Sequence, residues 1–422
     1  MSVAILFLLA AQTSSATTAD DLTAYLGTDE LYYDIEGEGP KLSLYGFIDF
    51  SYAKHVARER STLTDLVARD SFAIGGVNLY LDANIAPKWR SLAEIRAHYA
   101  PNGVEDHDFE TGNVTTTNTT YVDLNDYTTE TRWGGIELER VWLEYAAFPW
   151  LRLKAGIWLT PYGIWNVDHG SPTIVGVRLP TLVQQALFPE RQAGVQVDGS
   201  WGFDEWTIKY AMTLSNGRGS FDGIRDLDGN KAIGGRLAVE WSGSAQLSVG
   251  TSGYYGRHTA GRRILGTVED PTKQLPTFDV VVETQSDELA LGADLRFMWR
   301  GLLVQAELAG QRVAYTDEGR PPAVAGIAGL QPDHLRWGGY GLAGYRIAFL
   351  GLMPYAMYEF IDFGAPVLIK RASSLSLGIN ARPVPAVTLK VEYSRHSLSE
   401  VSIAGRSSSL VSSITTQAAW AF

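Results

Sequence analysis

The feature that most constrains the fold of this chain is a two-residue alternation of apolar and polar side chains. From about residue 43 onward, segments of about ten residues repeat this pattern. In the segment 287–299, Leu289 and Leu291 belong to one set of alternate positions. Glu288 and Asp294 belong to the other set. Since successive side chains of a β-strand point to opposite faces, each segment predicts a strand with one apolar face and one charged face.

The connections between these segments alternate in length along the whole chain. Short links, such as 86–88 and 300–301, alternate with long links, such as 100–135 and 160–191. A soluble β-sandwich also has alternating strands, but it has no reason to keep short turns at one end and long loops at the other. That asymmetry is typical of barrels in outer membranes.

Sixteen strands are predicted in this way, and the even number leaves both chain ends on the short-turn side. The predicted segments are 43–52, 72–85, 89–99, 136–147, 151–160, 192–199, 205–215, 232–241, 245–256, 287–299, 302–315, 337–349, 352–363, 373–382, 385–396 and 409–422. We therefore predict an all-β fold, a transmembrane antiparallel β-barrel of about 16 strands with short periplasmic turns and long extracellular loops. A barrel of this size encloses an aqueous channel rather than a core filled with side chains.

Composition excludes several other classes of protein. The 422 residues include 35 basic and 47 acidic ones, so the net charge is −12. This argues against a nucleic-acid partner, because phosphate binding needs clustered lysine and arginine. The chain contains no cysteine, which excludes disulfides and thiolate metal sites. We predict no cofactor and no metal site. The acidic loop 105–110 near His98 and His107 is interpreted as a solvated loop, with weak cation binding as the alternative.

The amino-terminal part of the chain has a different pattern. Val3–Ala11 is an apolar run that is too short to span a bilayer, and small residues follow it at 14–16. We predict a signal peptide at 1–16, with a buried amino-terminal strand as the alternative. The acidic segment 17–42 is predicted to be a periplasmic tail, with an inserted plug or a trimer contact as alternatives. Residues 43–422 are predicted to form the barrel pore domain.

Tryptophan residues gather at one end of the predicted strands. Those at or next to short turns are Trp89, Trp150, Trp201, Trp206, Trp241 and Trp299. Amphipathic indole rings favour the headgroup level of a membrane, so membrane barrels carry aromatic girdles there. Ordinary capping of a soluble core by aromatic residues is the alternative. Their collection at one end of the strands favours a girdle.

Three segments resemble those of a known family. The last predicted strand ends on Phe422, and a terminal phenylalanine on such a strand resembles the sorting signal of Gram-negative outer-membrane barrels. Leu44–Asp49 (LYGFID) resembles the first strand of bacterial porins. Leu153–Gly163 (LKAGIWLTPYG) is similar to a strand and turn of the phosphate-selective, O/P-like porin group. The resemblance implies a sixteen-stranded barrel in the outer membrane of a Gram-negative bacterium, commonly a homotrimer, that passes small polar solutes by diffusion.

One long link resembles the loop that narrows trimeric porins. In those porins the third long loop folds into the barrel, and the link 160–191 is the third long loop predicted here. Its apolar stretch 174–179 would be unusual on an open surface, and four prolines stiffen the link. A surface lid or a trimer contact is the alternative. The candidate constriction residues are Tyr162, Trp165, Asp168, His169, Arg178 and Glu190.

Charged side chains on the polar faces are candidates for the pore lining. The predicted lining charges are Arg96, Arg140, Glu144, Arg152, Lys154, Lys209, Arg236 and Arg296. Because the signs are mixed on the polar faces, many charges should pair across neighbouring strands. This departs from the basic interior that a phosphate-selective pore implies. The cluster of Arg140, Arg152 and Lys154 is the best local anion site, with a partly neutralised wall patch as the alternative.

These patterns predict a passive pore rather than an enzyme. No Gly-x-Ser-x-Gly elbow, Walker loop or His-Glu-x-x-His motif occurs in the sequence. We predict an outer-membrane porin that forms a water-filled channel for passive diffusion of small hydrophilic solutes or ions. The expected partners are outer-membrane lipid, lipopolysaccharide, the solutes themselves and further copies of the chain in a homotrimer. The alternatives are a non-channel barrel that acts as a receptor or structural protein, and an outer-membrane hydrolase.

Overall fold

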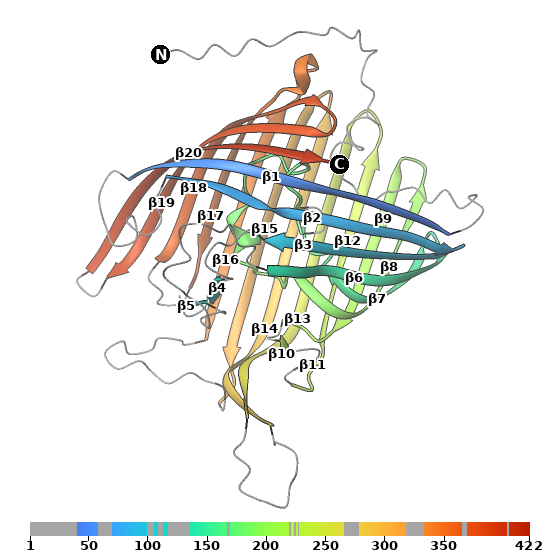
Figure 1. Ribbon diagram of the computed structural model, residues 1–422, viewed down its shortest axis with the longest axis vertical. Coiled ribbons are helices and arrows are strands. Elements are labelled where there is room, and N and C mark those ends of the chain that lie inside the picture. The colour runs from blue at the N-terminus through green and yellow to red at the C-terminus, as the bar shows by residue number, and fades with distance from the viewer. Residues whose placement is uncertain are drawn as a thin grey trace, which may run out of the picture.

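The computed structural model is a closed barrel of β-strands (Figure 1). The residues that the structure describes are 40–57, 70–98, 105–108, 113–116, 135–166, 169–218, 221–222, 225–226, 228–265, 278–317, 319, 333–364, 369–402 and 405–422. The predicted signal peptide and all but the end of the predicted tail lie outside the described residues.

Sixteen strands form the barrel, each antiparallel to its two neighbours, which confirms the predicted fold class. In barrel order the strands are β1 (Lys41–Ala57), β2 (Ser71–Ala86), β3 (Trp89–His98), β6 (Gly135–Phe148), β7 (Leu151–Leu159), β8 (Arg191–Phe203), β9 (Trp206–Ser215), β12 (Ala232–Ser242), β13 (Gln246–Leu265), β14 (Phe278–Trp299), β15 (Leu302–Tyr315), β16 (His334–Tyr345), β17 (Met353–Asp362), β18 (Ile369–Val384), β19 (Val387–Ser402) and β20 (Gly405–Ala421). Two small hairpins lie in the long links: β4 (Glu105–Asp108) with β5 (Asn113–Thr116), and β10 (Phe221–Asp222) with β11 (Arg225–Asp226). The short helices are α3 (Thr181–Gln184) and η3 (Phe349–Gly351).

The barrel closes where its first strand pairs with its last. In the β1–β20 register, Phe47 lies opposite Ala421. The backbones of Gly46 and Phe422 exchange two hydrogen bonds of 3.0 Å each. The ring of Phe422 covers Gly46 so closely that a larger residue there would overlap it. Closure satisfies the backbone groups that a free sheet edge would leave exposed to lipid.

The two faces of the wall follow the alternation in the sequence. Leu291 on β14 and Leu377 on β18 leave 60% and 51% of their surface exposed on the outside. Glu288 on β14 and Glu392 on β19 point inward and are buried. An apolar exterior around a polar interior reverses the arrangement of a soluble protein. It is stable where lipid replaces water outside the wall.

Aromatic side chains surround the short-turn end of the barrel. Those with the largest exposed indole surfaces beside short turns, between 41% and 70%, are Trp89, Trp150, Trp201, Trp206 and Trp299. Phe148 and Trp150 stack with their rings 5.0 Å apart in the turn between β6 and β7. This belt lies where an aromatic girdle at a membrane interface is expected. In the described part of the chain, no helix is long and apolar enough to cross a membrane.

The hairpin of β13 and β14 extends well past the predicted strand ends. The sequence predicts strands at 245–256 and 287–299, whereas the two strands remain paired as far as Leu265 and Phe278. An ion pair of 2.7 Å between Arg257 and Asp287 lies at the start of this extension. The apolar alternation stops earlier because a strand beyond the lipid needs no apolar face, although its backbone pairing continues.

Candidate functional site at the pore constriction

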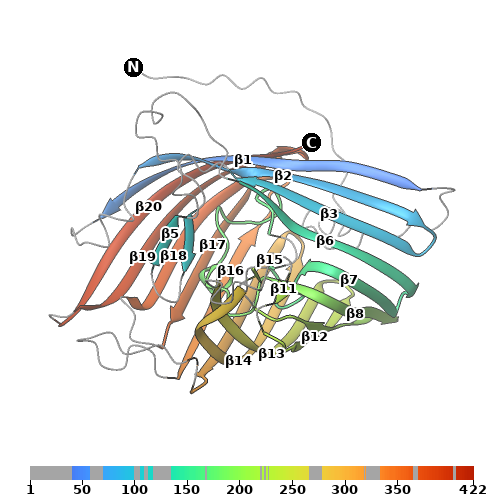
Figure 2. The ribbon, with the colours of Figure 1, turned by 60° about the horizontal axis from the view of Figure 1, so that its bottom comes forward.

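The link between β7 and β8 folds back into the barrel as a closed loop. We call residues 160–190 the constriction loop. Its neck is closed by a backbone hydrogen bond of 2.9 Å from Thr160 N to Glu190 O. The side-chain amide of Asn166 lies 2.8 Å from Thr160 O and 2.9 Å from Glu190 O, so it bridges the two ends. In Figure 2 the closed ring of strands surrounds this green segment.

The entry of the constriction loop is bound to two strands in turn. The hydroxyl of Tyr162 lies 2.8 Å from that of Thr213 on β9. Gly163 N donates to the Ser252 hydroxyl on β13 at 3.2 Å. Gly163 has a φ of +73° and lies against the carboxylate of Glu307 on β15. A side chain at this position is therefore disfavoured both by the backbone conformation and by the lack of space. Burial raises the pKa of Tyr162 to about 12, and the hydroxyl therefore stays protonated at neutral pH.

Trp165 continues this path to the far side of the lumen. Its indole Nε1 donates a hydrogen bond to the hydroxyl of Tyr340 on β16. The two rings meet edge to face with centroids 6.0 Å apart. The Tyr340 hydroxyl in turn donates to Glu307 on β15 at 2.8 Å. Both aromatic side chains are buried, so the loop is anchored to the wall by a polar chain enclosed in apolar surroundings.

The middle of the loop is held by a buried lysine. Lys390 on β19 donates to the backbone oxygens of Ser171 and Gly176, each at 2.7 Å. The Ser171 hydroxyl donates to Asp49 on β1 at 2.7 Å. Asn380 on β18 donates to Val175 O at 3.1 Å. Backbone carbonyls that a buried loop would leave without donors are satisfied by side chains of the wall.

Arg178 is bound to the wall of β17. Its guanidinium forms an ion pair with Glu359, which is buried, and lies 3.2 Å from the Ser374 hydroxyl on β18. The second oxygen of Glu359 accepts a hydrogen bond of 2.8 Å from Thr181 N at the start of α3. One carboxylate therefore fixes both a side chain and the backbone of the loop.

Apolar side chains form the underside of the constriction loop. Ile174, Val175, Leu182 and Leu187 are all buried. They pack on an inner wall that is itself apolar, and we call its residues the apolar seat: Leu342, Met353, Met357 and Ile361 on β16 and β17. Each fully buried side chain of this kind stabilises the folded state by about 1.5–3 kcal/mol. The loop is thus held inside the barrel by apolar packing as well as by hydrogen bonds.

Small inward residues make room for this packing. Gly234 on β12 and Gly292 on β14 both face the loop. In the structure a methyl group at Gly234 would overlap the Tyr162 hydroxyl, and one at Gly292 would lie 2.9 Å from Phe188. These glycines therefore leave room for the aromatic side chains of the constriction loop.

The wall on the other side of the lumen is charged. Four ion pairs run from β2 to β8, and we call them the charged ladder: Arg90–Asp82 at 2.7 Å, Arg140–Glu94 at 2.7 Å, Lys154–Glu144 at 3.5 Å and Arg152–Asp198 at 2.5 Å. The ring of Trp142 lies between two of its cations, 5.6 Å from Arg90 and 4.6 Å from Lys154. Cross-strand pairs of opposite charge stabilise a sheet and lower the net charge of its surface.

The remaining predicted lining charges lie further around the wall. Lys209 pairs with Glu240 at 3.0 Å, and Arg236 pairs with Asp294 at 2.5 Å. Arg296 lies half-buried on β14, at an alternate position to Asp294 and so on the same face. Each cation of the predicted anion cluster belongs to a pair of the ladder, an arrangement that matches the neutralised wall patch rather than a free anion site.

The ladder and the constriction loop meet around His169. A polar cavity of about 40 Å³ lies between them and is lined by Asp49, Arg96, Arg140 and His169, among others. Of the predicted anion cluster, only Arg140 lines this cavity. Asp168 lies outside the described residues.

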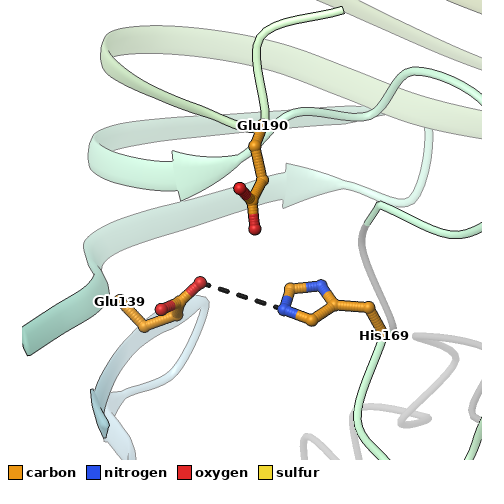
Figure 3. Close-up of side chains that lie close together, drawn as sticks. All are labelled: Glu139, His169 and Glu190. Atoms are coloured by element: carbon orange, nitrogen blue, oxygen red, sulfur yellow. Dashed lines mark ion pairs between the residues drawn. The ribbon is translucent and has the colours of Figure 1, made fainter. Parts of the chain in front are cut away.

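Glu139 is a site residue that the sequence did not suggest. A register shift between β3 and β6 lies at Glu94 and Ile95, opposite Arg140 and Leu138. This bulge turns Glu139 inward together with Arg140, against the two-residue alternation. Glu139 is buried and lies 3.8 Å from His169, while Glu190 completes the cluster in Figure 3. Strict two-residue alternation places Glu139 on the outer face, and only the register shift brings it inward.

Comparisons with known proteins identify the fold. No family model and no curated protein matches the chain. A loop L8 deletion mutant of OmpT, an outer membrane protein of Vibrio cholerae, is 12% identical with a TM-score of 0.51, over 91% of this chain and 100% of that one. The trimer form of OmpT is 11% identical with a TM-score of 0.50, over the same shares. An anion-selective porin from Comamonas acidovorans is 12% identical with a TM-score of 0.50, again over 91% and 100%. The chain thus has the porin-like barrel fold of outer-membrane proteins.

Proposed function

We propose that this chain is an outer-membrane porin, a water-filled channel through which small hydrophilic solutes or ions diffuse. The observation that carries the proposal is the constriction loop, which is bound on one side to the apolar seat and faces the charged ladder on the other. The similarity of the chain in fold to an anion-selective porin supports the same proposal. Such an arrangement narrows a wide barrel without a chemical step, and we propose no enzymatic activity.

The proposed mechanism follows from the two faces of the wall. Outward apolar side chains contact lipid, while the closed sheet satisfies the backbone groups. Solutes cross along the charged ladder, where water and polar side chains solvate them. The edge of the constriction loop limits their size, and local charge filters them.

The proposed setting is the outer membrane of a Gram-negative bacterium, reached through a signal peptide at 1–16. Outer-membrane lipid and lipopolysaccharide are the proposed surroundings of the exposed apolar band. A homotrimer is the proposed assembly, and the trimer form of OmpT, a protein with the same fold, supports it.

Selectivity is the finer part of the proposal. The resemblance of Leu153–Gly163 to phosphate-selective, O/P-like porins favours anions. The pairing of Arg140, Arg152 and Lys154 with carboxylates favours a weaker preference than a basic interior would give. We therefore propose a general diffusion pore with at most a modest preference for anions.

Planar-bilayer recording tests this function. The refolded protein should give steady conductance steps, and a salt gradient should give a small reversal potential. A large reversal potential with the sign of anion selectivity would favour the phosphate-selective group. Silence from a barrel that is folded, as judged by circular dichroism, would contradict a pore and favour a receptor or structural barrel.

A further inference from the structure

Three side chains from separate segments converge beside the constriction loop. Glu139 comes from β6, His169 from the middle of the loop and Glu190 from its end (Figure 3). One donor atom of each lies within 4.8 Å of the other two. Two carboxylates and an imidazole form a donor set that suits zinc and neighbouring transition metals.

Glu139 is the buried member of this cluster. Its side chain is fully buried, and neither of its oxygens accepts a hydrogen bond from the residues that the structure describes. Oε1 lies 3.8 Å from His169 Nε2. Oε2 lies on the side of two arginines, 3.5 Å from Arg191 and 3.9 Å from Arg96. The two arginines supply positive charge on the side of Oε2 from beyond hydrogen-bond distance, whereas Oε1 faces only the imidazole. A buried carboxylate oxygen that has lost its water without gaining a hydrogen bond is costly, and a cation next to Oε1 would offset that cost.

One hydrogen bond of His169 determines which of its two ring nitrogens carries the hydrogen. The other nitrogen faces Glu139. His169 Nδ1 lies 2.9 Å from the backbone oxygen of Asn166. A carbonyl oxygen can only accept, so Nδ1 carries the hydrogen. The neutral ring then directs its Nε2 lone pair toward Oε1 of Glu139. Two acceptors facing each other need a positive charge between them, or a proton on the ring.

We propose that Glu139, His169 and Glu190 bind a divalent transition-metal ion such as Zn²⁺. Metal-bound histidines commonly donate their other ring N–H to a backbone carbonyl, as His169 does. Zinc ligands at about 2.0–2.2 Å in tetrahedral geometry lie about 3.3 Å apart, so small side-chain movements bring the donor atoms to the ion. Arg191 and Arg96 hold the second oxygen of Glu139, which orients the carboxylate.

The ion would tie the constriction loop to the wall. Glu139 belongs to β6, whereas His169 and Glu190 belong to the loop, so one ion links them at the side facing the charged ladder. The effect on permeation rests on the proposed pore function, but the binding of the ion does not. The two parts of the proposal can therefore fail separately.

Isothermal titration calorimetry of the full refolded chain with Zn²⁺, at pH 7.5 in a buffer without chelators, tests the binding. We expect one ion per chain. Glu139→Gln and His169→Gln should each weaken binding at least about tenfold. The matched control is His258→Gln, because His258 Nδ1 makes the same kind of contact, 2.9 Å from Arg218 O, while its neighbour Glu288 is paired with Arg218. This control should bind Zn²⁺ like the wild type.

Two results would overturn the metal site. One is a wild-type chain that binds no Zn²⁺ at pH 7.5. The other is a folded His169→Gln variant that binds Zn²⁺ as tightly as the wild type. Should Glu139→Gln fail to fold, the loop variant His169→Gln decides alone. In bilayers, Zn²⁺ should alter the conductance of the wild type and not that of His169→Gln. If zinc binds without changing the conductance, only the link between the metal site and permeation is overturned.

Discussion

The two inner walls of the barrel differ in what covers them. The seat on β16 and β17 is apolar and is covered by the constriction loop. The ladder from β2 to β8 consists of ion pairs interleaved with aromatic rings. An apolar inner surface would repel water and hinder polar solutes, so covering it removes that surface from the lumen. In the proposed function, the loop therefore narrows the pore while the polar wall remains available to the solute.

The largest effect is expected under the loop. Met357→Ala removes a buried side chain of the apolar seat and leaves a cavity, so the free energy of unfolding should fall by about 2–5 kcal/mol. Urea titration in detergent micelles, followed by tryptophan fluorescence, measures it. Met212→Ala is the matched control, because Met212 is 64% exposed on the outer face. Equal losses in both variants would mean that the loop does not pack on the seat.

A smaller effect is expected at the ion pair that fixes the loop. Glu359→Ala leaves Arg178 and Thr181 N without their carboxylate, which should lower the free energy of unfolding by about 1–3 kcal/mol. The same titration measures the loss. Glu240→Ala breaks a pair with Lys209 whose side chains are about one-third exposed, and should cost about 0–1 kcal/mol. A larger loss of unfolding free energy for Glu240→Ala than for Glu359→Ala would show that Glu359 does not fix the loop to the wall.

The smallest effect is expected in the charged ladder, and it concerns selectivity. Replacing Arg152 and Lys154 by glutamine leaves Asp198 and Glu144 without their cations, so the reversal potential should shift toward cations. The matched double variant is Lys41→Gln with Lys88→Gln, which removes the same charge from exposed positions near the short turns. An unchanged reversal potential in the ladder variant would place these residues away from the ion path.

The sequence predicts the walls of the barrel better than the seat of the loop. Period-two alternation and link lengths suffice for sixteen strands, and parity alone puts Glu94, Arg140 and Glu144 on one side. The seat gives no such signal, because β17 (MPYAMYEFID) is apolar on both faces near Met353 and Met357. Which inner wall the loop covers depends on contacts between residues far apart in the chain.

The bulge at Glu139 shows the same limit at the level of one residue. Strict alternation directs Glu139 outward, toward lipid, which is a costly place for a carboxylate. The structure resolves the conflict by a local register shift. A charged residue at an apolar position of a barrel strand is therefore a reason to expect a bulge, although its position cannot be derived from spacing.

Residues 160–190 are proposed to narrow the pore. Single-channel conductance of a variant that lacks Trp165–Arg178 tests it most directly, with a variant lacking residues 266–277 of the β13–β14 link as control. Both variants should first show the strand content of the wild type by circular dichroism. We expect a larger conductance for the first variant and an unchanged conductance for the control. A folded first variant whose conductance equals that of the wild type would show that the loop does not narrow the pore.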